Sequence, residues 1–335
     1  MPAGGDGAIR FSAGPALTVQ EAPATKFGAM KEGFTTAGET VRVYTRRNTD
    51  GSPVFNGDAV TWDGSAWSYD NIRYWNWTSS SDYYDFLAVY QPAGMAISPT
   101  FDNAAIPLRL SASYNAAAAQ YDLMLAGTRR KYEDENHLSP VSLEFRHMLS
   151  AVTFKLTNLS NATQVRLDGY HFENIVTQGT ASVSADYDSE GNPAFAWSET
   201  SRQATPTGGS VSASAAELSG RIPWTVGTNR TKTVDLYDLM IPQSHEGKIG
   251  ADGYPVLVVD YTPIGFSPGH AEILLKDIPV TGGTTPITGW EAGTKYCYEI
   301  NIDPDAGAKV RVIVMPWDDV QAETPGLLLP PDLTL

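Results

Sequence analysis

Apolar side chains recur at every second position along most of this chain, and this period constrains the fold more than any other feature of the sequence. Val41 and Val43 share one face of the run ETVRVYT, and Phe86, Ala88 and Tyr90 share one face of YDFLAVY. A period of two is typical of a β-strand with one buried face, whereas a helix repeats its apolar residues every three to four positions. We therefore expect the chain to be built from strands.

Other runs of the same character follow, with turn signals between them. The expected strands include VSLEF (141–145) and the ranges 9–13, 151–156, 165–172, 233–241, 254–261, 271–280, 295–302 and 309–317. The turn signals include Asp50-Gly51, Gly191-Asn192-Pro193 and Gly282-Gly283. One run, NAAAAQYDLML (115–125), suits a short helical turn followed by a strand. Many strands without an alternating helical pattern indicate antiparallel β-sandwiches and not a parallel α/β sheet.

The length of 335 residues suggests two domains of roughly 150 residues each. A hydrophilic stretch at 127–140 contains Arg129-Arg130-Lys131, then Glu133, Asp134 and Glu135, and charges of this density are expected to lie in solvent. We therefore predict a domain over 1–140, a second over 141–325, and a tail at 326–335. The Ser/Thr/Gly-rich stretch 198–217 is expected to be a surface loop.

Charge and cysteine content exclude several classes of protein. With 23 Lys and Arg against 38 Asp and Glu, the net charge is −15, which disfavours binding to nucleic acid or to anionic membranes. Cys297 is the only cysteine, so no internal disulfide can form. No apolar run reaches the roughly 18 residues of a membrane span. Met1 precedes the small-residue segment PAGGDG, and we expect it to be an expression start that replaces a removed signal segment.

The residues that could carry catalysis or bind a metal have simpler explanations. Gly265–Gly269 matches G-x-S-x-G, but Pro268, which follows the would-be nucleophile Ser267, has no N–H for an oxyanion hole, so a turn between strands is the better interpretation. The histidines have no metal-ligand spacing. The stretch 303–307 resembles the start of a calcium loop and lacks its later acidic ligands, so it too is expected to be a turn. We expect no cofactor, no metal and no enzymatic activity.

Eight aromatic residues fall within a short window: Trp62, Trp67, Tyr69, Tyr74, Trp75, Trp77, Tyr83 and Tyr84. Several alternate with polar residues, as the core-facing aromatics of a sandwich do. Exposed together, they would instead form a surface for a glycan or a protein partner, with Trp62, Trp67, Tyr74, Trp75 and Trp77 as its candidate residues.

Segments spread over nearly the whole chain resemble the fimbrillin (Mfa-like) family of type V pili from Gram-negative anaerobes. The most specific are FRHMLSAVTFKL (145–156), WEAGTKYCYEI (290–300) and the closing MPWDDV. The resemblance implies two transthyretin-like antiparallel β-sandwich domains in tandem and a C-terminal extension. It also implies export as a lipoprotein to the outer-membrane surface. Assembly with other pilus subunits would follow by strand exchange, after a surface protease removes the first strand.

The residues themselves fit a removable first strand. Ile9, Phe11 and Ala13 share one face, and the two-proline connection PALTVQEAPAT follows them. The processing candidates are Lys26, Lys31, Arg42 and Arg46. Removing the strand would leave an apolar slot with unpaired backbone groups, which is a template for strand addition.

The carboxyl-terminal tail has the pattern expected of the donor strand that would enter this slot. In 326–335 one parity carries only leucine or proline, with the leucines at Leu327, Leu329, Leu333 and Leu335. In the isolated monomer the tail could instead fold back on its own second domain. Two further functional hypotheses remain beside the pilus subunit. One is a monomeric surface lipoprotein that binds glycans through the 62–84 aromatics, and the other is an esterase that depends on Ser267.

Overall fold

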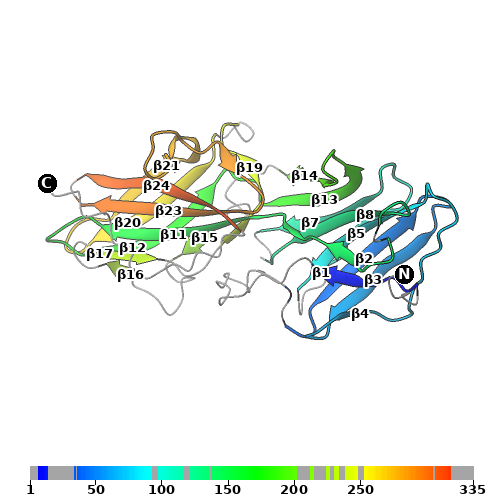
Figure 1. Ribbon diagram of the computed structural model, residues 1–335. Coiled ribbons are helices and arrows are strands. Elements are labelled where there is room, and N and C mark those ends of the chain that lie inside the picture. The colour runs from blue at the N-terminus through cyan, green and yellow to red at the C-terminus, as the bar shows by residue number, and fades with distance from the viewer. Residues whose placement is uncertain are drawn as a thin grey trace.

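The computed structural model describes residues 7–13, 34, 36–92, 97–116, 121–135, 137–201, 212–214, 224–226, 230–233, 238–247, 253–304 and 306–317. Its secondary structure consists of strands β1 to β24 and one short 3-10 helix, η1 (Leu275–Asp277). The predicted all-β fold with antiparallel sheets is confirmed. No helix in this part of the chain is long and apolar enough to cross a bilayer. Figure 1 shows an elongated molecule with two lobes placed end to end.

The first lobe is a sandwich of two sheets. The larger sheet contains, in spatial order, β10 (Arg146–His147), β8 (Met124–Lys131), β5 (Tyr83–Gln91), β2 (Thr40–Arg47), β3 (Pro53–Trp62) and β4 (Trp67–Ser68). The smaller sheet has the order β14 (Pro193–Ser201), β13 (Gln178–Tyr187), β7 (Arg109–Asn115) and β6 (Thr100–Asp102). Leu87 of the larger sheet and Val183 of the smaller sheet belong to one buried core.

The second lobe is also a sandwich. One sheet has the order β17 (Arg230–Thr233), β11 (Ser150–Asn158), β23 (Thr294–Asp303) and β24 (Gly307–Pro316), with β18 (Asp238–Met240) also on β11. The other has β15 (Ser212–Ser214), β12 (Val165–Glu173), β20 (Val256–Pro263) and β21 (Gly269–Leu274), with β16 (Trp224–Val226) also on β12. A small pair, β19 (Gln243–Ser244) and β22 (Gly289–Trp290), completes the lobe. Unlike most pairs, β11 and β23 run parallel.

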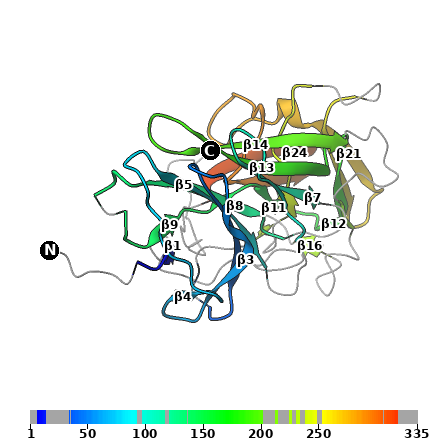
Figure 2. The ribbon, with the colours of Figure 1, turned by 90° about the vertical axis from the view of Figure 1, so that its right-hand side faces the viewer.

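A third layer covers the outer face of the larger sheet of the first lobe. It contains β1 (Phe11–Ala13), which pairs in parallel with β9 (Val141–Leu143), and Figure 2 shows these two strands next to each other. Because of this layer, β5 is buried on both faces: Leu87 faces one core, and Phe86 and Ala88 face a separate one. The alternation in the sequence predicts that β5 has one buried face. The structure differs, because the third layer buries the other face as well.

The chain does not divide into its two lobes at residue 140. The hairpin of β13 and β14 pairs with β7, which places residues 178–201 in the first lobe (Figure 1). β9 and β10 lie after residue 140 and also belong to the first lobe. This arrangement differs from the predicted division into 1–140 and 141–325, because strand alternation carries no information about which sheet a strand joins.

The charged stretch that begins at Arg129 is not a loop in solvent. Arg129 and its two neighbours are the end of β8, paired with the start of β5. The Arg129 guanidinium donates to Asp85, with Nε 2.7 Å from Oδ1, and lies over the rings of Tyr83 and Tyr187. Asp85 is buried, and burial raises the pKa of its carboxyl. A buried carboxylate needs a cationic partner. Because Arg129 is that partner for Asp85, the prediction that Arg129 lies in a solvated loop was wrong.

The predicted turns are confirmed. Gly51, Gly191 and Gly282 all lie in turns with positive φ, at 66°, 86° and 83°. The G-x-S-x-G stretch is the turn between β20 and β21. Several predicted segments differ in detail. The strand at 271–280 ends at 274 and continues into η1, and the strands at 9–13 and 141–145 are limited to 11–13 and 141–143. The range 233–241 supplies the end of β17 and all of β18, and the predicted loop at 198–217 contains the end of β14 and all of β15. The residues of the expected helical turn at 117–120 lie outside the described residues.

Candidate functional site: the amino-terminal strand and its groove

The segment from Gly7 to Ala13 is held by two different parts of the first lobe. On one side the backbone N–H of Ile9 donates to Arg73 O at 2.8 Å, and Trp75 N donates to Gly7 O at 3.0 Å. Further along, Val141 N donates to Arg10 O at 2.7 Å, and β1 pairs with β9 over three residues. The segment therefore lies between residues 73–75 and β9 without being part of either large sheet.

Two side chains of this segment fill the core under the third layer. Ile9 is fully buried and Phe11 is 7% exposed. The Phe11 ring packs edge-on against Phe55, Tyr69 and Phe86, with centroids 5.3, 5.8 and 6.0 Å away. Burial of an isoleucine and a phenylalanine stabilises the docked strand by about 3–6 kcal/mol before the entropy of ordering is subtracted.

We call the surface beneath this strand the β1 groove, and its residues are Phe55, Tyr69, Phe86, Val141 and Leu143. They come from β3, the segment after β4, β5 and β9, so four separate parts of the chain form it. Without residues 7–13, the groove would present these apolar side chains together with unpaired groups at Arg73 O and Val141 N. An apolar slot flanked by free backbone groups accepts an extended strand.

Part of the aromatic window forms the wall beside this groove. Trp75 and Trp77 stack with centroids 5.0 Å apart and an interplanar angle of 12°. Both rings meet the Tyr84 ring edge-on, and Trp75 also packs on Phe86. The two tryptophans are partly buried against the core that Ile9 and Phe11 enter. Sequence reasoning found this cluster but not its contact with the strand.

The other candidates of the glycan hypothesis lie apart from this stack. Trp62 and Trp67 pack on each other with centroids 5.6 Å apart, and Trp67 meets Phe34 at 5.1 Å. Only Tyr74 of the five candidates is classed as exposed, at 58% of its surface. The indole N–H groups of Trp62, Trp75 and Trp77 are buried, with no hydrogen-bond acceptor among the described atoms. A glycan surface in this window stays a prediction.

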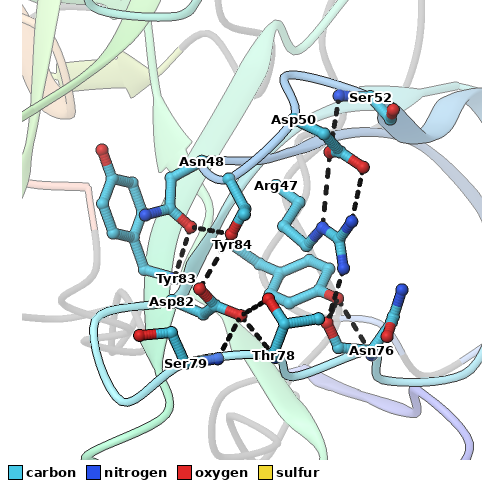
Figure 3. Close-up of polar contacts among 11 residues, drawn as sticks. Arg47, Asn48, Asp50, Ser52, Asn76, Thr78, Ser79, Asp82, Tyr83 and Tyr84 are labelled. Atoms are coloured by element: carbon cyan, nitrogen blue, oxygen red, sulfur yellow. Dashed lines mark hydrogen bonds and ion pairs between the residues drawn. The ribbon is translucent and has the colours of Figure 1, made fainter.

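A polar network fixes the loop that carries Trp75 and Trp77 (Figure 3). The Asp82 carboxylate accepts hydrogen bonds from Thr78 N, Thr78 Oγ1, Ser79 N and Thr49 Oγ1, at 2.6, 2.9, 3.1 and 2.8 Å. These bonds, first of all the one from the Thr78 backbone, lower the pKa of Asp82 to about 2. The Asp82 carboxylate thus closes the loop.

A second part of the network ties the same loop to the β2–β3 turn. Arg47 pairs with Asp50, and its Nη1 donates to Asn76 O at 2.7 Å. The Tyr84 hydroxyl lies 3.0 Å from Asn76 N, which donates to it. None of these bonds involves residues 7–13, so removal of that segment would not break them.

The processing candidates fall in two places. Arg42 and Arg46 lie in β2, which is paired on both sides, with β3 and β5. Arg42 Nε donates to Gln91 Oε1 at 2.7 Å, and Arg46 Nη1 donates to Asn103 O at 2.9 Å. Lys26 and Lys31 lie outside the described residues. The leucines of the proposed donor strand, Leu327, Leu329, Leu333 and Leu335, also lie outside them.

Comparison with known proteins identifies relatives of this chain. A model of the fimbrillin-like family matches residues 28–317. No curated protein matches the chain by sequence. The fold is similar to that of a fimbrial protein from Bacteroides vulgatus ATCC 8482, with a TM-score of 0.58, 15% identity, and 92% of this chain and 99% of that chain covered.

Weaker structural similarity extends to two further proteins. A putative cell adhesion protein from Bacteroides uniformis ATCC 8492 has a TM-score of 0.46 and 16% identity, covering 93% of this chain and 100% of that one. The tip fimbrial protein Mfa3 from Porphyromonas gingivalis has a TM-score of 0.42 and 12% identity, covering 85% and 96%. The family match alone spans most of the sequence, and on that ground the chain belongs to the fimbrillin-like family.

Proposed function

We propose that this protein is a structural and adhesive subunit of a cell-surface pilus, assembled by strand exchange with other subunits after its first strand is removed. The observation that carries the proposal is the segment 7–13, which buries Ile9 and Phe11 in a groove yet belongs to neither large sheet. Membership of the fimbrillin-like family supports the pilus role and a location at the cell surface. In this proposal the precursor is exported as a lipoprotein, as the sequence resemblance implies.

Proteolysis between the first strand and β2 would release the strand. A cut after Lys26 or Lys31 separates residues 7–13 from the rest of the lobe and leaves β2 (Thr40–Arg47) intact. A cut after Arg42 or Arg46 would instead divide β2, which has partners on both sides, and a paired strand resists proteases that need an extended, unpaired substrate. The proposal therefore favours Lys26 and Lys31 as processing sites for a surface protease.

The tail is long enough to reach a neighbouring subunit. β24 is ten residues long and runs back along the second lobe to Trp317, close to the first lobe, where Trp317 stacks on His147 with centroids 4.2 Å apart. The chain continues from 318 to 335, and 18 extended residues span about 60 Å. A donor strand that ran back beside β24 would use about 33 Å of that length and would leave about eight residues to enter a neighbour. This remainder corresponds to the leucine-rich stretch proposed as the donor strand.

The first experiment is limited digestion of the purified protein with trypsin, followed by electron microscopy and sedimentation. We expect loss of the amino-terminal segment and the appearance of filaments or ladders of oligomers. The variant Lys26→Ala/Lys31→Ala should resist this processing and stay monomeric. Filament formation by that uncut variant at the same rate would contradict the role of processing.

The second experiment tests the donor strand. Deletion of residues 326–335 should abolish filaments while the processed protein keeps its thermal transition, because the tail is not needed for either core in this proposal. A matched variant, Leu329→Asp/Leu333→Asp, keeps the length and should act in the same way, since a charged side chain cannot enter an apolar groove without a large desolvation penalty. Filaments of normal length from either variant would rule out the donor role of the tail.

A further inference from the structure

An apolar hollow beside the free edge of β24 has no role in strand exchange as proposed above. It measures about 450 Å³, and its apolar lining includes Leu159, Ile273, Ala308 and Val310. Val312 is bonded at the outer edge of β24 to Pro279 O and Thr281 N. The backbone groups of Val310 and Ala308, two and four residues earlier, point the same way and bond to no other described strand or loop at this edge.

The hollow lies toward the end of the second lobe that is farthest from the first. β24 begins at Gly307 in this region, and Leu159 follows the end of β11 there. Leu159 is 49% exposed, and the exposed cations Lys309 and Arg311 border the hollow. None of the ion pairs within the described residues includes either cation. The hollow is therefore an apolar pocket bordered by two cations, with Glu299 opposite Arg311 on β23.

The opposite end of the molecule carries a surface with the complementary character. This surface is the loop after β8, at residues 132–135 and 137–138. Its apolar side chains Tyr132 and Leu138 expose 41% and 47% of their surface. Its exposed carboxylates Glu133 and Glu135 take part in no ion pair within the described residues. We call this the acidic loop. Because it lies at the far end of the first lobe, it cannot reach the hollow of its own chain (Figure 1).

We propose that the hollow binds the acidic loop of a second copy of this protein, so that the far end of one second lobe docks on the far end of the next first lobe. Leu138 or Tyr132 would enter the apolar lining, and Glu133 and Glu135 would pair with Lys309 and Arg311. Two different surfaces meet, so the contact is heterologous and generates an open chain of subunits. Partial desolvation of complementary charges favours this register over contacts between like ends.

The contact goes beyond strand exchange and gives it a direction. Leu138 lies three residues before Val141, which lines the β1 groove. Docking of the acidic loop would therefore place an emptied groove beside the second lobe of the neighbour, on the side toward which its tail would run. It would align two subunits before any strand is exchanged.

Cysteine cross-linking tests this arrangement, since Cys297, the only native cysteine, is buried. Unprocessed Leu138→Cys and Leu159→Cys proteins are mixed with a short bismaleimide. Heterodimers should form at least tenfold faster than in a mixture of Leu159→Cys with Ile106→Cys, whose side chain is 92% exposed on the connection between β6 and β7. Equal rates, or a predominance of dimers of Leu159→Cys with itself, would overturn the proposal.

Charge reversal provides the second test. Lys309→Glu/Arg311→Glu in the Leu159→Cys protein should slow cross-linking at least fivefold, and Glu133→Lys/Glu135→Lys in the Leu138→Cys partner should restore it. Glu246→Lys, an exposed change elsewhere, should not restore it. High salt should reduce the difference. Failure of the restoring pair would refute the charge contacts.

Deletion of 326–335 separates this contact from strand exchange. If the truncated proteins cross-link as before but form no filaments, both proposals stand. If they no longer cross-link, the tail makes the contact and the hollow does not. If the truncated proteins both cross-link and form filaments, the docking proposal stands and the tail is not the donor strand.

Discussion

β1 and β11 both place a phenylalanine in a buried core, but they are held in different ways. β11 has nine residues, pairs with β23 at nine positions on one side, and pairs with β17 and β18 on the other. β1 has three residues and one ladder partner, β9. Phe154 in β11 is 1% exposed and Phe11 in β1 is 7% exposed, so burial of the ring does not distinguish the strands.

Whether a strand can be replaced therefore depends on its backbone partners and not on how apolar it is. Opening β11 breaks ladders on both sides and exposes the centre of the second lobe. Opening β1 breaks a few hydrogen bonds and exposes one groove, while the larger sheet of the first lobe keeps all its ladders. The free energy of releasing β1 should therefore lie well below the free energy of unfolding of the protein.

The largest effect is expected for Phe154→Ala. The Phe154 ring packs on Tyr170, Phe172 and Tyr298, with centroids 3.9, 5.7 and 5.7 Å away. Its removal should lower the free energy of unfolding by about 3–5 kcal/mol, measured by urea denaturation with tryptophan fluorescence. Phe154→Leu, which retains most of the volume, should lower it by less. A loss below 1 kcal/mol for the alanine variant would mean that β11 is no more permanent than β1.

The next effect is a dependence of stability on pH in the second lobe. His245 is fully buried beside Trp290, its ring nitrogens have no partner among the described atoms, and burial lowers its pKa to about 4. Unfolded histidine has a pKa of about 6.5, so between pH 6.5 and 4 the unfolded state binds a proton that the folded state does not. Stability should therefore fall by about 3 kcal/mol as the pH decreases through this window.

His245→Leu is the control for this titration. It removes the titrating group, so the loss of stability between pH 6.5 and 4 should be smaller by most of that amount, as urea denaturation at a series of pH values would reveal. An unchanged slope in the variant would show that other groups account for the pH dependence. The effect should appear in the unfolding of the second lobe, while the exchange of amide hydrogens in residues 7–13 should not follow it.

Phe11→Ala should produce a smaller and local effect. The variant can destabilise the protein by no more than the free energy with which residues 7–13 bind the groove, because the segment detaches once that free energy is lost. We expect the main unfolding transition to move by less than about 1–2 kcal/mol. Amide protection should fall selectively in 7–13 and 141–143, as hydrogen exchange would measure. A drop in global stability as large as that of Phe154→Ala would identify β1 as a permanent strand.

The sequence predicts the strand character of the chain far better than it predicts the partners of the strands. β13 escaped prediction because its buried positions are small, with Gly179, Ala181 and Ala185 among them, so its alternation is weak. The parity of Ile9 and Phe11 indicated a strand that docks by one face. Its contacts could not be predicted, since Phe55, Tyr69 and Val141 are distant in sequence and their strands have no pattern that specifies pairing.

The smallest effect tests one tyrosine hydroxyl on each side of the comparison. The Tyr69 hydroxyl donates to Ile9 O at 2.6 Å, and the buried Tyr114 hydroxyl donates to Leu239 O at 3.1 Å. Tyr114→Phe removes one bond. Tyr69→Phe removes the bond to Ile9 O and also the bond that Arg73 N donates to the Tyr69 hydroxyl at 3.3 Å; each bond is worth about 0.5–1.5 kcal/mol. Tyr114→Phe should lower the global free energy of unfolding by that amount. Tyr69→Phe should leave it unchanged and speed amide exchange in residues 7–13 by up to about tenfold, because only the release of β1 becomes easier. If both variants lowered global stability equally, β1 would unfold together with the main core and would not be a separable strand.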